Sequence, residues 1–125
     1  MSDRRRLLGQ RGEQLAEGYL VNKGFRIVER NVRTKRGEMD LIALDGKCLV
    51  FIEVRTRRSQ SFGTAGESIT WKKKQKLREL ALEYLQKSAQ PIPSFRFDVI
   101  AIYTGASTQG EDFMKPVIEH YESAF

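Results

Sequence analysis

Cysteine is scarce in this 125-residue chain: Cys48 is the only one, which excludes an intramolecular disulfide. A single cysteine within a predicted strand fits the reducing cytoplasm, where we expect the protein to reside. Long apolar runs are missing as well, since no stretch approaches the roughly 20 residues that span a bilayer, and we expect no membrane partner. The basic N-terminal run is not followed by an apolar segment, so we expect no signal peptide.

Internal repeats and low-complexity segments are also absent from the sequence. Its composition, 40% hydrophobic and 30% charged, is that of an ordinary globular protein. A chain of this length can bury one core but not two, so we predict a single domain over residues 1–125. The formal net charge of +6 suggests an anionic partner, although many basic proteins have none.

The central segment of the chain is residues 37–58, where two apolar-rich runs flank the turn signal Asp45-Gly46-Lys47. This pattern predicts a β-hairpin. With Gly46 and Lys47 as the turn residues, Asp45 pairs with Cys48, whereas a turn at Asp45-Gly46 shifts the pairing by two and keeps every residue on its face. One face is charged only at the end far from the turn. The other face is wholly apolar and carries Met39, Leu41, Ala43, Val50, Ile52 and Val54.

Acidic residues meet at the charged end of this hairpin. The first register places Asp40 opposite Glu53 and Glu38 opposite Arg55, and directly opposed Cβ atoms lie about 4.5–5.5 Å apart. Two carboxylates that close repel each other unless a positive charge lies between them. A cation such as Mg²⁺ supplies that charge, and phosphate chemistry commonly uses one. A cross-strand Glu38–Arg55 ion pair, with the other two acids at a solvated sheet end, fits the same spacing.

Periodicity and turn residues predict the remaining elements. They are a helix over 7–23 ended by Gly24, a strand over 25–34, a helix over 71–87 with Thr70 as N-cap, a buried parallel strand over 95–103, and an edge strand over 113–121. Pro116 excludes a central position for the last strand. Loops are expected at 59–68 and 105–112. The fold class is therefore α/β, with a mixed sheet flanked by helices in the order α-β-β-β-α-β.

Basic residues cluster on three segments that are candidates for phosphate contacts. They are Arg33, Lys35, Arg36, Arg57, Arg58, Lys72 and Lys76. A solvated helix face or a protected edge strand carries similar charge, so the pattern alone does not decide the role. The apolar stripe of the second helix, Leu77, Leu80 and Tyr84, continues back to Lys73 and Lys74, which either point toward the sheet or extend around the helix end to solvent. Of the two, the spacing favours Lys73 as the lysine that lies against the sheet beside the charged end of the hairpin.

The spacing D-x(12)-E-V-R from Asp40 to Arg55 resembles the P-D…(D/E)-x-K nuclease superfamily, with Arg55 where that pattern has lysine. More narrowly, the chain resembles the YraN family of bacterial endonuclease-like proteins, relatives of archaeal Holliday-junction resolvases. The matching pieces are R-G-E-Q-L-A at 11–16, N-V-R at 31–33, G-E-M-D-L-I-A at 37–43, F-I-E-V-R-T-R at 51–57, K-K-Q-K-L at 73–77 and F-D-V-I-A-I at 97–102.

This resemblance implies the restriction-endonuclease-like fold and metal-dependent hydrolysis of DNA phosphodiesters, with branched or structured DNA as substrate and a homodimer as the active form. Mg²⁺ or Mn²⁺ would be held by Asp40, Glu53, the Val54 carbonyl and Glu13 of the first helix, although the spacing of Glu13 by itself favours a solvated helix face. Gln75 would orient the attacking water or contact the DNA backbone.

Arg55 is the departure from the superfamily pattern, because a guanidinium stays protonated and cannot relay protons. We hypothesise that Lys73 supplies the missing function. Two other hypotheses stay open: a nucleic-acid-binding module without turnover, and a scaffold whose basic face meets an acidic protein. Asp98, in the predicted buried strand, needs a partner, for which a structural hydrogen bond is the commoner case. His120, the only histidine, is assigned no role.

Overall fold

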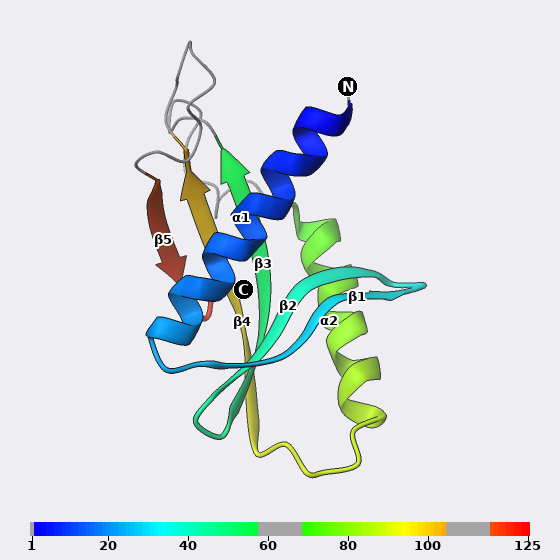
Figure 1. Ribbon diagram of the computed structural model, residues 1–125. Coiled ribbons are helices and arrows are strands. Elements are labelled where there is room, and N and C mark those ends of the chain that lie inside the picture. The colour runs from blue at the N-terminus through cyan, green and yellow to red at the C-terminus, as the bar shows by residue number, and fades with distance from the viewer. Residues whose placement is uncertain (1, 58–68, 105–115) are drawn as a thin grey trace.

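The computed structural model describes residues 2–57, 69–104 and 116–125. These residues form a five-stranded mixed sheet with a helix packed on each face (Figure 1). The elements in chain order are α1 (Ser2–Asn22), β1 (Arg26–Thr34), β2 (Gly37–Asp45), β3 (Cys48–Arg57), α2 (Trp71–Gln86), β4 (Ser94–Tyr103) and β5 (Val117–Tyr121). The strands lie in the order of the chain, and only β3 and β4 run parallel. The predicted class, element order and edge strand are confirmed, while the two predicted loops lie outside the described residues.

Helix α1 ends where the sequence predicts. Gly24 has a φ of 103°, and the Phe25 N–H donates to the Leu20 carbonyl at 2.9 Å, as in a left-handed glycine cap. Its predicted start at residue 7 is wrong, because the helix begins at Ser2. The arginines at 4–6 give no apolar periodicity, yet arginine is a good helix former. Among the described residues, no helix combines the length and apolarity needed to cross a membrane.

The hairpin has the first of the two predicted registers. Asp45 pairs with Cys48, and the pairing of β2 with β3 continues to Leu41 and Ile52. Gly46 has a φ of 61° and takes the turn position that requires a positive value. The hairpin prediction is confirmed over this stretch.

Beyond Leu41, two predictions about the hairpin are wrong. Strand β2 stays paired with β1 and bends away from β3 (Figure 1), and β1 carries Asn31 at a φ of 52°. Met39 consequently packs on the α2 face rather than beside Leu41 on the α1 face. Glu38 pairs with Arg33 of β1, its Oε2 lying 3.4 Å from Arg33 Nε, and not with Arg55.

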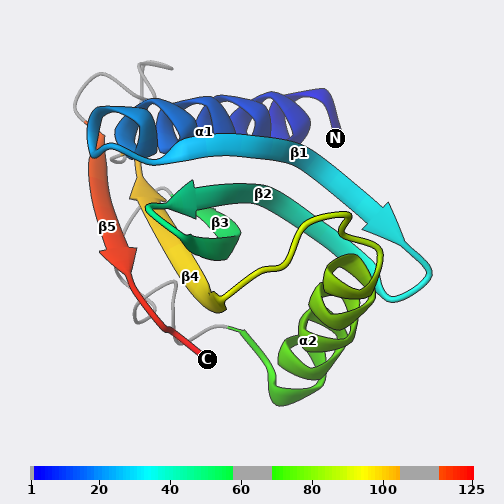
Figure 2. The same cartoon turned by 90° about the horizontal axis from the view of Figure 1, so that it is seen from below.

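The two helices lie on opposite faces of the sheet, as Figure 2 shows from below, and an apolar layer holds each of them there. Ala16 and Leu20 of α1 pack on alternate residues of the inner strands, and Leu77, Leu80 and Ala81 of α2 pack on the residues between them. Truncating a fully buried leucine typically destabilises a protein by about 2–5 kcal/mol. The position of both helices against the sheet is therefore firmly determined by packing.

At Gly12, helix α1 approaches β3 so closely that a Cβ atom would overlap Thr56 Oγ1. We expect Gly12→Ala to lower the free energy of unfolding by about 1–3 kcal/mol, because one partner must move. Gly18→Ala in the same helix, where nothing lies within 4 Å of the new atom, should instead stabilise by about 0.5–1 kcal/mol. Urea denaturation measures both values. Equal stabilisation by the two alanines would contradict the close approach.

Candidate functional site

The candidate site lies in the opening where β2 leaves β3. There the Val54 N–H donates to Asp40 Oδ2 at 2.8 Å. The Asp40 side chain therefore accepts this N–H of β3, because the β2 backbone is no longer paired with β3 at this point. The N–H and C=O of one strand residue point to the same side of the strand. The Val54 carbonyl therefore faces the same opening as the Asp40 carboxylate.

Glu53 is the buried acid of the site, with a side chain only 5% exposed. Its Oε2 lies 2.6 Å from Lys73 Nζ of α2 and 4.0 Å from Arg55 Nε. The structure thus places Lys73 against the charged end of the hairpin, as its position in the helical stripe predicts. Thr70 supports this turn as the predicted N-cap, because its Oγ1 accepts the Lys73 N–H at 3.1 Å.

Asp40 and Glu53, the acidic pair, are close enough to share a proton. Burial raises the pKa of Asp40, and the charge and hydrogen bond of Glu53 raise it further, to about 8, despite the Val54 N–H that lowers it. Glu13 adds a smaller repulsion. This raised pKa of Asp40 shows that Lys73 and Arg55, which lie beside Glu53, do not offset the burial of Asp40 and its repulsion by Glu53.

Glu13 brings a third carboxylate toward the pair from α1. Burial raises the pKa of Glu13, and repulsion from Glu38 and Glu53 raises it further. Glu13 also lines a groove of about 510 Å³ between α1 and the β1–β2 strands, together with Gln10, Gln14, Glu17, Arg30, Asn31 and Leu41. The close approach of Gly12 to Thr56 brings this part of α1 to the site.

The donor chemistry fits a hard divalent cation, since every candidate ligand is a carboxylate or carbonyl oxygen. Within 2–57, 69–104 and 116–125, no three His, Cys, Asp or Glu side chains converge enough to hold an ion by themselves. Asp40 and Glu53 would therefore need the Val54 carbonyl and water to complete the shell, and the ligand role of Glu13 stays a prediction. The buried Arg55 Nε has no hydrogen-bond partner among the described atoms, which leaves a donor beside the acidic pair.

Residues 12–102, which include all the candidate acids, match the description "Uncharacterised protein family UPF0102". The chain belongs to the UPF0102 family. It is 45% identical over 118 residues to a UPF0102 protein of Rhodococcus opacus (strain B4), covering 94% of this chain and 95% of that protein. It is 44% identical over 125 residues to a UPF0102 protein of Pelotomaculum thermopropionicum, with 100% of both chains covered. These names state no activity, so the function has to be inferred from the site.

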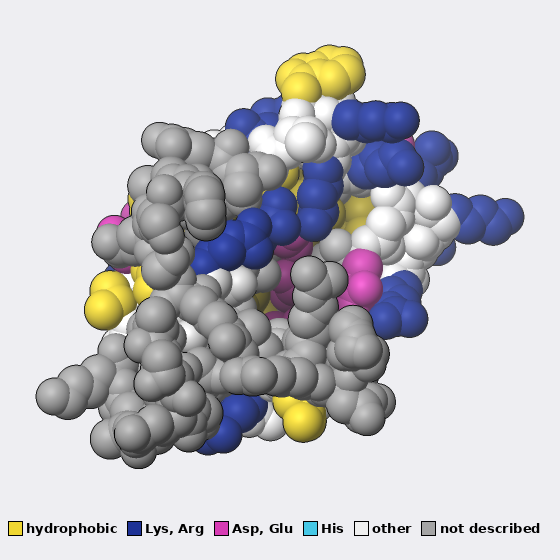
Figure 3. All heavy atoms as spheres, turned by 90° about the horizontal axis from the view of Figure 1, so that it is seen from above, with side chains coloured by type: hydrophobic (Ala, Val, Ile, Leu, Met, Phe, Trp, Pro, Cys, Tyr) yellow, Lys and Arg dark blue, Asp and Glu magenta, His cyan; other side chains and the backbone are white. Residues whose placement is uncertain are grey.

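In this UPF0102 family member, Figure 3 shows Lys and Arg side chains gathered beside acidic side chains on one face. We define the basic surface as the exposed residues among those predicted to contact phosphate: Arg33, Lys35, Arg36, Arg57, Lys72 and Lys76. Arg36 Nη1 lies 3.6 Å from Glu79 Oε2, which ties the β1–β2 turn to α2. Arg58 lies outside the described residues. Gln75 is half-buried and makes no hydrogen bond to either acid in the described part of the chain, so its role stays a prediction.

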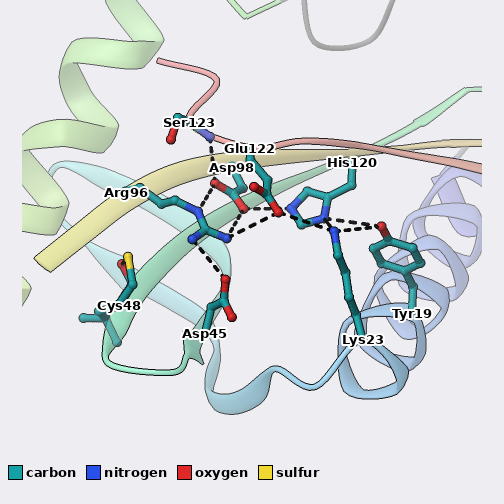
Figure 4. Close-up of polar contacts among 10 residues, drawn as sticks. Tyr19, Lys23, Asp45, Cys48, Arg96, Asp98, His120, Glu122 and Ser123 are labelled. Carbon is teal, nitrogen blue, oxygen red and sulfur yellow. Dashed lines mark hydrogen bonds and ion pairs between the residues drawn. The ribbon is translucent and has the colours of Figure 1, made fainter.

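A second polar cluster in this family member surrounds Asp98 (Figure 4). Asp98 is fully buried and accepts hydrogen bonds from Arg96 Nε at 3.0 Å, the Ser123 N–H at 3.0 Å and His120 Nε2 at 2.7 Å. Burial alone would raise the pKa of Asp98, but these hydrogen bonds outweigh it and lower the pKa. The cluster ties β4 to β5 and the C-terminal segment.

The Asp98 cluster is separate from the acidic pair. Asp98 alternates with Ile100 and Ile102 on the α1 face, whereas Glu53 alternates with Phe51 on the α2 face. We interpret Asp98 and His120 as structural. Sequence reasoning missed the histidine, because its partner lies 22 residues away and no local pattern links the two.

Proposed function

We propose that this UPF0102 family member is a metal-dependent nuclease that hydrolyses phosphodiester bonds of DNA. One observation carries the proposal: two carboxylates in contact at a strand opening, one of them 2.6 Å from a lysine, within a basic surface. The resemblance to YraN proteins and to the restriction-endonuclease-like fold supports the same reading and makes branched or structured DNA the first substrate to test.

The basic surface would hold the DNA backbone. Phosphate contacts position a nucleic acid without reading its sequence, and Lys35, Lys72 and Lys76 present their ammonium groups to solvent. Arg33 and Arg36 make only weak, exposed ion pairs with glutamates, so a phosphate can compete for them. The DNA is thereby brought to the opening that contains Asp40 and Glu53.

At the opening, Asp40, Glu53 and the Val54 carbonyl would hold Mg²⁺ or Mn²⁺. Such a cation polarises a phosphate and lowers the pKa of water when bound. Arg55, whose Nε lies 4.0 Å from Glu53 Oε2 but makes no hydrogen bond among the described atoms, would donate to a phosphate oxygen and stabilise negative charge there. Lys73 holds Glu53 in place through their 2.6 Å ion pair and would supply the function that the superfamily pattern gives to its lysine.

The test is incubation of the purified protein with linear, nicked, flapped and four-way DNA in Mg²⁺, Mn²⁺ or EDTA. We expect cleavage of at least one branched substrate with either cation and none in EDTA. Cleavage that persists in EDTA would contradict metal dependence. Absence of cleavage on every substrate, with the protein folded and bound to DNA, would overturn the nuclease proposal.

A non-catalytic DNA-binding module is the second candidate. It is favoured by the two cations that already accompany Glu53, since Lys73 and Arg55 partly neutralise this acid without a metal. Binding without turnover on any substrate would support this candidate.

Both candidates predict that DNA affinity falls steeply with salt. Each phosphate neutralised on duplex DNA contributes about −0.9 to the slope of log affinity against log salt. We expect a slope of about −3 or steeper from the six residues of the basic surface. Lys72→Ala should make the slope shallower by about one, and Lys47→Ala, at the far end of the hairpin, should leave it unchanged. A flat affinity between low and high salt would exclude backbone recognition and favour an acidic protein partner.

A further inference from the structure

Trp71 is the only tryptophan of the chain, and its position in the structure is unusual. With 74% of its surface accessible, it is the most exposed large hydrophobic residue in the described part of the molecule. Tryptophan is highly buried on average, because exposure of its large apolar ring to water is unfavourable. An aromatic ring in this position is available for a contact with another molecule.

The ring lies at the end of α2 that borders the acidic pair. Trp71 is the first residue of α2, two positions before Lys73, which reaches Glu53 at 2.6 Å. The Thr70 cap orders this first turn, and helical side chains lean toward the N-terminus. Trp71 therefore projects beyond the N-terminal end of α2, from the same turn that carries Lys73.

The charged side chains around Trp71 favour an anionic binding partner. Residues 72–78 include five basic side chains and no acidic one, and α2 has no acid in its first turn. Positive charge at a helix N-terminus opposes the helix dipole, and an arriving phosphate removes this local repulsion. An apolar protein patch would gain nothing from these lysines, whereas nucleic acid offers phosphates to them and base faces to the ring.

We propose that Trp71 stacks on an unpaired base of the DNA whose backbone lies on Lys72 and Lys76. This inference rests on the proposed function and specifies its substrate: DNA with a single-stranded or splayed segment beside the site. In a continuous duplex every base face is already stacked on its neighbours, so the ring has no partner. A flap, gap or junction exposes such a face.

The sole tryptophan makes its own fluorescence the probe of stacking. Titrations in EDTA, where no cleavage occurs, compare a single-stranded oligonucleotide, a gapped duplex, a fully paired duplex of equal length, and heparin, a polyanion without bases. We expect strong quenching by the first two and little by the duplex or heparin. Trp71→Ala, followed by anisotropy of labelled DNA, should weaken single-strand binding about ten-fold and heparin binding very little.

Leu82→Ala is the matched control, since Leu82 is 54% exposed further along the same helix and should change neither affinity. DNA binding without quenching would overturn the stacking proposal and leave the proposed function standing. Equal weakening of DNA and heparin binding by Trp71→Ala would overturn it as well. Failure of every DNA to bind would remove both the inference and the function on which it rests.

Discussion

Asp40→Asn is expected to abolish DNA cleavage while making the metal-free protein more stable. Loss of one carboxylate removes a charged ligand at which a cation would be held, so we expect cleavage to fall by about 10³-fold or more. The same change removes the repulsion between Asp40 and Glu53, which burial intensifies. Active sites often store such destabilisation, and relieving it raises stability at the expense of function.

The stability gain should depend on pH. The pKa of Asp40 is about 8 in the folded protein and about 3.9 in an unfolded chain. Because the folded pKa is raised, the stability contributed by protonated Asp40 is complete below about pH 4 and is lost as the pH rises through 8. Asp40→Asn should therefore differ little from the native protein near pH 4. At pH 9 the variant should be more stable than the native protein by about 2 kcal/mol. This value is smaller than the free energy that corresponds to the whole pKa difference, because solvent screens a half-buried group. Thermal unfolding in EDTA at pH 4 and at pH 9 measures the two stability differences.

Asp45→Asn is the control on the same strand. Asp45 lies at the opposite end of β2, where its Oδ2 is 3.1 Å from Arg96 Nη1, and its replacement should preserve cleavage and the pH profile. Glu53→Gln should also abolish cleavage, but without a comparable stability gain, because it removes the partner of Lys73. Full cleavage by Asp40→Asn would exclude the metal assignment, and an unchanged pH profile would contradict contact between the two acids.

The elements that could be predicted are those with a local signal. Period-two alternation and Gly46 determine the register from Asp45–Cys48 to Leu41–Ile52, and apolar residues on both faces mark β4 as a buried parallel strand. Lys73 could be found because it interrupts an apolar helical stripe. In each case one segment carries the whole pattern.

The divergence of β2 from β3 could not be predicted, because Met39 and Leu41 continue the alternation through it. It depends on tertiary structure: the extended pairing of β1 with β2, the left-handed Asn31, and the packing of Met39 on α2. The candidate site lies at this divergence, so sequence reasoning brought the two acids together but did not find the strand geometry around them. Sequence reasoning also paired Glu38 with Arg55, because the alternation gives no sign that β2 leaves β3.

Lys73→Met is expected to slow cleavage of bound DNA about 100-fold while changing DNA affinity little, because Lys73 Nζ is 2.6 Å from Glu53 and points into the site. Lys76→Met should weaken DNA binding and leave the cleavage rate of bound DNA unchanged, since Lys76 is exposed on the basic surface. Single-turnover cleavage at saturating DNA separates the rate from the affinity. Loss of the ion pair leaves Glu53 buried without its closest cation, so a stability loss of about 1–2 kcal/mol should accompany Lys73→Met.

Lys73→Arg distinguishes charge from proton transfer. Arginine keeps the positive charge beside Glu53 and should restore most of the lost stability, but it stays protonated at every accessible pH. If Lys73 takes part in proton transfer, Lys73→Arg will remain as slow as Lys73→Met. If the lysine acts only as a fixed charge, the arginine variant will recover the native rate. Equal losses of affinity in Lys73→Met and Lys76→Met, with unchanged turnover of bound DNA, would contradict both roles. The first turn of α2 would then serve as a phosphate clamp, and Arg55 would be the only cation left to act at the acidic pair.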